Sequence, residues 1–265
     1  WNVSLKKGQT INIGYKYNAP IISPQFYLIG ALSLYSGSNT LVFQENRFWQ
    51  IAADAIAFVQ EVGTYTTGTS SNTHVVTITN APTTGNHLIM TFVIGGGRNL
   101  NSVTDTAGNT WQVDGNQQNG TNHSISVAST YITNALTTSD TITATFSNTN
   151  VAAAVVGEYS GLDTTSWFDQ ANSSANASST SVVSGSTPTT AQADELLIGA
   201  MGWAGSTASL TPEVLSPVWN QGTKMSSTGT NRTIQPMHRI VSATGAYAAN
   251  GTLSSASVNT AIIAT

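Results

Sequence analysis

Two stretches decide the fold: "GNHLIMTFVIGG" (Gly85–Gly96) and "ADELLIGAMGWAG" (Ala193–Gly205), which repeat nearly the same pattern. In each, polar residues are followed by an apolar run and then by small residues. A short apolar run of this kind, bounded by turn residues, is typical of a buried strand. The chain therefore contains two candidate copies of one strand, and a true repeat should extend beyond them.

The repeat keeps its offset in a second segment. "TFSNTNVAAAVV" (Thr145–Val156) aligns with "TLSSASVNTAII" (Thr252–Ile263) at an offset of 107 residues (252 − 145). Trp111 and Trp219 pair at an offset of 108 (219 − 111). Two matching segments and a tryptophan pair thus stay in register to within one residue.

Two architectures could explain this repeat: two independent small domains, or two related halves of a single β-sandwich. We favour the second, because a half that forms a single layer must bury its apolar face against a partner. From Ile56 onward, short β-branched runs alternate with Gly, Asn, Thr and Ser clusters about every ten residues, as in all-β sandwiches. We predict an all-β fold in which residues 55–265 form a two-layer β-sandwich, jelly-roll or immunoglobulin-like, with halves of about 55–160 and 161–265.

Residues 1–54 have a different pattern. In "TINIGYKYNAP", Ile11, Ile13, Tyr15 and Tyr17 alternate with polar residues, as in a half-buried strand. The apolar run "FYLIGALSLY" (Phe26–Tyr35) follows. So few strands bury too little surface to be stable alone. We expect this segment to dock on the sandwich or to receive strands from another chain.

Composition excludes several functions. Only 8% of residues are charged, the formal net charge is −4, and the eight Lys and Arg are scattered, so no basic surface for nucleic acid is expected. The chain has no cysteine, which excludes disulfides and thiolate chemistry. No apolar run approaches the ~18 residues of a membrane span, so we expect no membrane insertion. The Ser, Thr and Asn content, and a start at Trp1 without Met, lead us to expect an extracellular or cell-surface protein, processed or cut from a longer chain.

Several segments resemble those of known modules. The stretch that begins "IAFVQEVGTYTTGTSSNTHVVTITNAPTTGNHLIMTFVIGG", continues with "SVTDTAGNTW" and ends with "VNTAIIAT" resembles a β-sandwich module of large exported bacterial and phage-associated proteins. "SLKKGQTINIGYKYNAPIISPQFYLIG" with "FQENRFWQIAADA" is similar to the closing strands of an immunoglobulin-like module from repetitive bacterial surface proteins. The resemblance implies a fold and a partial immunoglobulin-like segment over 1–54, but no ligand.

Catalytic motifs are not found in the sequence. The four histidines, His74, His87, His123 and His238, lack HExxH spacing, and no GxSxG elbow is present. Glu158, Asp169 and Glu195 lie beside apolar runs without the marks of a catalytic pair. We therefore predict no enzymatic activity and no cofactor.

A calcium site is a weak candidate, because Asp105, Asn109 and Asp114 bracket the turn "DTAGNTWQVD". The spacing is not that of an EF-hand. We favour the alternative that these side chains satisfy the backbone of their own turns, so no metal site is predicted.

Tryptophan and asparagine residues suggest contacts with sugars. Trp167 and Trp203 are the candidates for glycan contact, whereas the equivalent positions of Trp111 and Trp219 suggest packing. Possible glycosylation sequons lie at Asn2, Asn119, Asn122, Asn172, Asn176, Asn231 and Asn250.

The leading functional hypothesis is a non-enzymatic subunit of an extracellular filament or surface array, which assembles head-to-tail with copies of itself through its N-terminal strands. The residues expected to mediate assembly are Ile11, Ile13, Tyr15, Tyr17, Phe26 and Leu28. The alternative is a carbohydrate-binding or adhesin module of a larger surface protein or phage fibre, with glycans or a host surface as partners.

Overall fold

The computed structural model describes residues 6–11, 26–29, 33–36, 40–44, 46, 49–52 and 55–265. The chain divides into two compact units, Trp1–Ala53 and Asp54–Thr265. In the first unit, β1 (Phe26–Ile29) pairs with β4 (Trp49–Ala52), and β2 (Ser33–Ser36) pairs with β3 (Thr40–Gln44), both antiparallel. The described strands of this unit therefore form two-stranded ribbons.

The first half of the second unit contains eight strands. They are β5 (Ala57–Thr66), β6 (Ser71–Thr77), β7 (His87–Gly95), β8 (Leu100–Asp105), β9 (Trp111–Asn119), β10 (His123–Tyr131), β11 (Thr141–Asn150) and β12 (Ala152–Ser160). They form a five-stranded sheet of order β5-β12-β7-β10-β9 and a three-stranded sheet of order β6-β11-β8. All pairs are antiparallel.

The second half contains seven strands, which belong to one sheet. They are β13 (Ala171–Val183), β14 (Asp194–Ala204), β15 (Leu210–Pro212), β16 (Asn220–Gln221), β17 (Met225–Ser226), β18 (Arg232–Ser242) and β19 (Asn250–Ala264). The order is β13-β19-β14-β18-β16, with β15 paired to β19 and β17 paired to β18. Every described element of the chain is a strand, so the prediction of an all-β sandwich is confirmed.

The two halves share one strand order. β7 and β14 occupy matching positions in the repeat and have matching neighbours. β7 lies between β12 and β10, and β14 lies between β19 and β18. β19 corresponds to β11 and β12 joined into one strand. The start of β19 pairs with β15, as β11 pairs with β8. The end of β19 pairs with β14, as β12 pairs with β7. β13 corresponds in the same way to β5 and β6. The sequence repeat is thus also a repeat of topology.

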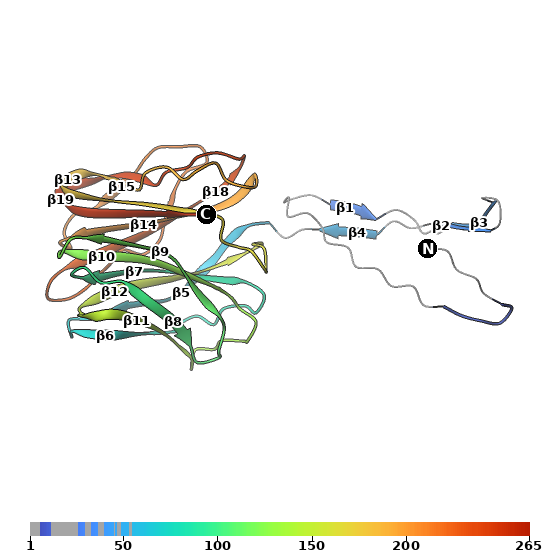
Figure 1. Cartoon of the computed structure of the whole chain (residues 1–265), viewed down its shortest axis with the longest axis horizontal. Coiled ribbons are helices and arrows are strands. Elements are labelled where there is room, and N and C mark those ends of the chain that lie inside the picture. Colours follow the sequence, from blue (N-terminus) through green and yellow to red (C-terminus); the bar gives the residue numbers. More distant parts are fainter. Residues whose placement is uncertain are drawn as a thin grey trace. The chain divides into compact units, whose positions relative to one another are not determined.

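Three hydrophobic cores hold the second unit together. One lies between the two sheets of the first half, and its largest buried side chains include Phe92 and Phe146. Another belongs to the second half and surrounds Trp203. The third lies between the halves, where residues such as Val93 and Ile125 meet Ile198 and Ile262. Figure 1 shows the three-stranded, five-stranded and seven-stranded sheets stacked in this order.

The layers differ in one respect from the expectation. Each half was expected to supply a single layer, but each has a core of its own, and the halves then pack against each other through a further apolar interface. The three central strands of the five-stranded sheet, β12, β7 and β10, are consequently buried on both faces, and all nine residues of β7 are buried. This explains why Gly85–Gly96 is a continuous apolar run without strand-like alternation.

The interface between the halves is nearly symmetric. β10 contacts β14 while β7 contacts β18, and β10 contacts β19 while β12 contacts β18. β7, β10 and β12 correspond to β14, β18 and the end of β19. A two-fold rotation that exchanges the halves therefore turns the first contact of each pair into the second. The same face of the repeated unit is therefore used twice.

Candidate binding groove

An open groove lies at one side of the interface between the halves. Its volume is about 390 Å³, within the range of about 300–1,000 Å³ that is usual for small-molecule sites. The first half contributes residues from β5, β7 and β12, and the second half contributes residues from β14, β16, β18 and the turn after β16. The groove thus exists only because the two halves are packed together.

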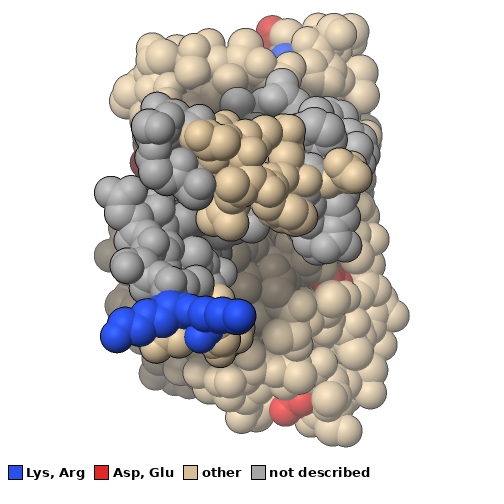
Figure 2. All heavy atoms as spheres, turned by 90° about the vertical axis from the view of Figure 1, so that its right-hand side faces the viewer, with Lys and Arg blue, Asp and Glu red and all other residues tan. Residues whose placement is uncertain are grey.

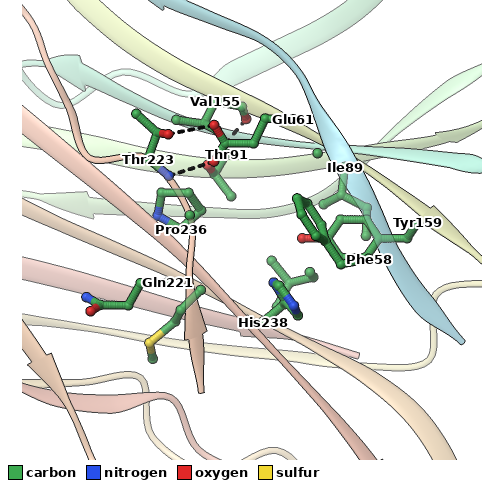
Figure 3. Close-up of a pocket in the computed structure, with 14 residues that line it drawn as sticks. Phe58, Glu61, Ile89, Thr91, Val155, Tyr159, Gln221, Thr223, Pro236 and His238 are labelled. Carbon is green, nitrogen blue, oxygen red and sulfur yellow. Dashed lines mark hydrogen bonds between the residues drawn. The ribbon is translucent and has the colours of Figure 1, made fainter. Parts of the chain in front are cut away.

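One end of the groove is closed by aromatic rings. Phe58 of β5 stacks on His238 of β18, with ring centroids 4.9 Å apart and an interplanar angle of 20°. Tyr159 meets both rings edge-on, at 5.5 Å from Phe58 and 5.6 Å from His238. Phe58 remains 39% exposed, whereas Tyr159 is buried. Figure 3 shows the three rings grouped on one side of the groove.

The opposite end is closed by hydrogen bonds between the halves. Glu61 accepts one bond from the Thr223 amide and another from the Thr223 hydroxyl, each 2.6 Å long and drawn in Figure 3. Gly222 is packed beneath this contact, because a Cβ there would lie 2.8 Å from Glu61 Oε1 and 3.0 Å from Pro236. The carboxylate of Glu61 is therefore fixed at the rim.

The floor is apolar. It is formed by buried residues from both halves, including Ile89, Val155, Ile198 and Met237. None of the described residues that line the groove is a Lys or Arg. Burial lowers the pKa of His238, which favours the neutral imidazole. The groove therefore combines an apolar floor and an aromatic wall with a fixed acceptor.

The tryptophans proposed for glycan contact lie elsewhere. Trp203 is completely buried in the core of the second half, so the expectation that it contacts a glycan is wrong. Trp167 is half-buried, its indole N–H donates to Ser129 Oγ at 2.8 Å, and its ring packs against His87. Trp111 packs on the core of the first half and Trp219 in that of the second, as the repeat predicts.

The calcium candidates are used in turns. Asp105 accepts from the Asn109 amide at 3.1 Å and from the Trp111 indole at 2.7 Å. Asn109 in turn accepts from the backbone amides of Thr133 and Asn134. Asp114 accepts instead from Gln112, and burial raises its pKa to about 6. Within the described residues, no three His, Asp or Glu side chains form a group that could hold a metal ion.

The carboxylates singled out in the sequence have separate environments. Glu158 is buried and accepts from the Thr83 amide, Asn86 Nδ2 and Gln60 Nε2 at 2.6–2.8 Å, which anchors the turn before β7. Glu195 is also buried, and desolvation, followed by the charge of Asp169, raises its pKa to about 7. The sequence could not have revealed the role of Glu158, because its partners lie more than 70 residues away.

The sequons occupy different settings. Asn119 Nδ2 donates to the Asn176 and Asn259 carbonyls, and Asn176 Nδ2 donates to Asn259 Oδ1, so these two side chains are used within the fold. Asn231 is exposed, with a φ of 47°. The side chains of Asn122, Asn172 and Asn250 also make hydrogen bonds, and Asn2 lies outside the described residues.

The residues expected to mediate assembly lie in the first unit. Ile11 is exposed, while Ile13, Tyr15 and Tyr17 lie outside the described residues. Phe26 and Leu28 belong to β1, opposite Ala52 and Gln50 of β4. A second apolar feature of this unit, the hairpin β2–β3, was not predicted, although the apolar run "TLVFQ" in β3 was the available signal.

Comparisons with known proteins returned nothing: no family model, no characterised protein and no solved structure matches the chain. The resemblance to bacterial surface modules stays a prediction. In the part of the chain that the structure describes, no helix has the length and apolar character needed to cross a membrane.

Proposed function

We propose that the chain is a non-enzymatic structural protein, an extracellular subunit that assembles head-to-tail into a filament or surface array through its N-terminal unit. The observation that supports this proposal is the hairpin β2–β3. Its large apolar side chains are each about half exposed: Leu34, Tyr35, Leu41, Val42 and Phe43, at 46–58%.

The hairpin has apolar residues on both faces. Leu34 lies opposite Phe43 and Tyr35 opposite Leu41, with Val42 as the extra residue of β3 at a bulge between the two pairs. Leu34 and Tyr35 are consecutive in β2 and therefore point to opposite faces. A two-stranded ribbon is at best marginally stable in water. Contiguous exposed apolar side chains of this kind mark interaction surfaces. The hairpin would therefore gain stability from a partner that covers it.

The second unit offers an edge that could accept a strand. β13 is the outermost strand of its sheet; Ser173 and Asn176 near its start are hydrogen-bonded to β9. Its thirteen residues, "ANSSANASSTSVV", include no charged residue and no proline. Edge strands usually carry such residues to prevent pairing with other chains. We propose that a ribbon from the first unit of one copy adds to β13 of the next, which is a heterologous contact that propagates.

The low charge of the chain favours such an assembly, because repulsion between copies is weak. On the face shown in Figure 2, Asp and Glu appear only at a few separate places. The formal net charge is −4 over 265 residues.

The proposal is tested with variants of the full chain. Replacing Val42 and Phe43 by Lys should abolish concentration-dependent association, as measured by sedimentation velocity and electron microscopy. The double variant Val214→Lys/Val218→Lys is the matched control, since these loop residues are 92% and 58% exposed and adding the same two charges there should leave assembly intact. Thr180→Lys, on exposed β13, should also block assembly. A wild-type chain that stays monomeric at high concentration would refute the proposal.

A further inference from the structure

The two sides of the interface between the halves are not equivalent. On one side, β9 meets β13 directly: Ser173 Oγ donates to Gln117 at 2.7 Å, and Asn119 Nδ2 donates to the Asn176 carbonyl at 2.7 Å. On the other side, the counterparts are β5 and the short strands β16 and β17. The two-fold relation predicts closure on this side as well, but the groove lies there instead.

Short strands explain why the groove is open. β9 has nine residues, whereas β16 and β17 have two each, separated by the turn Gly222–Lys224. The halves are nevertheless bridged there at separate places: Thr66 Oγ1 donates to the Ser226 carbonyl at 2.6 Å, Thr223 binds Glu61, and Phe58 stacks on His238. The groove is the space between the Thr223–Glu61 contact and the Phe58–His238 contact, so both of its ends are fixed by contacts between the halves.

The lining restricts the chemistry of a ligand. Glu61 carries two oxygens that only accept, and each uses one bond to Thr223, so lone pairs remain for donors from a ligand. Gln221 at the rim is exposed; its Nε2 donates to the Leu210 carbonyl at 3.1 Å, and its Oε1 can accept from a ligand hydroxyl. The aromatic wall and the apolar floor suit C–H groups. Among the lining residues that the structure describes, an anionic ligand would meet no Lys or Arg.

We propose that this groove binds one hexopyranose unit of a neutral glycan. A pyranose ring has an apolar C–H face for the wall of Phe58 and Tyr159, and hydroxyl groups around its edge for Glu61 and Gln221. The groove includes no residue of the N-terminal hairpin. Sugar binding at the groove is therefore a further property of the protein, and it does not depend on the proposed assembly. It also places carbohydrate recognition at residues other than Trp167 and Trp203.

The experiment titrates the isotope-labelled full chain with the methyl glycosides of glucose, galactose, mannose and N-acetylglucosamine, followed by chemical-shift changes in the NMR spectrum. At least one of these sugars should shift the amides of the groove, Gly157 and Gly222 among them. Phe58→Ala should weaken that binding by roughly tenfold or more. Val59→Ala is the matched control, because Val59 is the exposed neighbour of Phe58 outside the lining and its loss should leave binding unchanged.

A second variant and a second probe keep the outcomes distinct. Glu61→Gln retains the shape of the side chain but halves its accepting oxygens, and it should also weaken sugar binding, with an unchanged circular dichroism spectrum to show that the fold persists. Tetramethylammonium chloride tests the competing possibility of a cation between Glu61 and the rings. Binding of tetramethylammonium without any of the sugars, absence of binding by all four sugars, or binding unaffected by Phe58→Ala would each overturn the proposal.

Discussion

The imidazole Nε2 of His123 lies 2.8 Å from the hydroxyl of Thr260, and both residues are completely buried where β10 of one half meets β19 of the other. Nδ1 of the same ring lies 2.9 Å from Asn122 Oδ1. An amide oxygen only accepts, so Nδ1 carries the proton and Nε2 accepts from Thr260. The neutral ring therefore satisfies both contacts and links the halves within their shared interface.

The pH dependence of stability should report on His123. Burial, and then the charge of Arg232, lowers its pKa from 6.5 to about 4. The unfolded chain therefore binds the proton more readily, and the stability contributed by the neutral ring is present above pH 6.5 and lost as the pH falls towards 4, by at most about 3 kcal/mol. In urea unfolding, His123→Gln should have a lower free energy of unfolding than wild type near pH 7.5. The difference between the two proteins should be smaller near pH 4.5. Thr260→Val should be less stable than wild type but should lose stability in acid as wild type does. A difference between His123→Gln and wild type that is the same at both pH values would contradict the lowered pKa of His123.

Glu195 should show the opposite pH dependence. Its pKa is raised from 4.5 to about 7, so the folded state holds the proton more tightly than the unfolded chain does. The corresponding stability is full below pH 4.5 and is lost as the pH rises through 7, by up to about 3 kcal/mol. Glu195→Gln should therefore raise the melting temperature at pH 8 and change it little at pH 4.5. An equal effect at both pH values would argue against this environment.

Gly202 should tolerate no side chain. A Cβ at this position would overlap the Cγ2 methyl of Ile125 and lie 3.0 Å from Thr260 Oγ1, within the interface between the halves. We expect Gly202→Ala to destabilise the protein by about 1–3 kcal/mol in chemical denaturation. Gly115→Ala is the control at the same interface, where the added Cβ would lie 3.3 Å from Ile262, and it should cost less.

Glu158 should be required for stability. Replacing it by Ala removes the acceptor of three hydrogen bonds and leaves their donors, on Thr83, Asn86 and Gln60, without it. The expected loss is about 3 kcal/mol, measured by calorimetry. Glu213→Ala removes an exposed carboxylate that accepts a single bond from Asn250, and it should change stability by less than about 0.5 kcal/mol. Similar losses in the two variants would count against the anchoring role.

Calcium should not stabilise the turn that contains Asp105. The carboxylate already accepts from Asn109 and Trp111, and Asp114 is engaged elsewhere by Gln112. The melting temperature should therefore be the same with millimolar calcium and with a chelator. Asp105→Ala should lower it under both conditions, because the Trp111 indole loses its acceptor. A rise with calcium that Asp105→Ala abolishes would restore the calcium hypothesis.

The fold could be predicted because it depends on local patterns that occur twice. Gly85–Gly96 and Ala193–Gly205 became β7 and β14, which have matching neighbours in their sheets. The number of layers could not be predicted, since a buried run such as that of β7 does not reveal how many sheets cover it. The core of the second half, around Trp203, draws most of its buried residues from β13, β14, β15, β18 and β19. Of these strands, β13 and β19 each join what are separate strands in the first half.

The candidate groove was not predictable for a different reason. Phe58, Glu61, Thr223 and His238 are up to 180 residues apart (238 − 58) and belong to no motif, and they meet only because the halves pack together. Tryptophan was a poor guide to sugar contact because Trp203 is large and apolar enough to fill a core. The contact of the Asp105 carboxylate with the Asn109 backbone amide lies within one turn and was anticipated from local sequence. The Asn109 side chain accepts instead from Thr133 and Asn134, outside its own turn, which was not anticipated.

The two-fold contacts between the halves make the second unit a covalently joined counterpart of an isologous dimer, in which one surface binds its own copy. Between β12 and β13 only residues 161–170 connect the partners. A tether this short holds the two faces at an effective concentration of about millimolar or more, so that their association is a unimolecular step. Closure of the interface, and with it the groove along its side, therefore does not depend on the concentration of the protein.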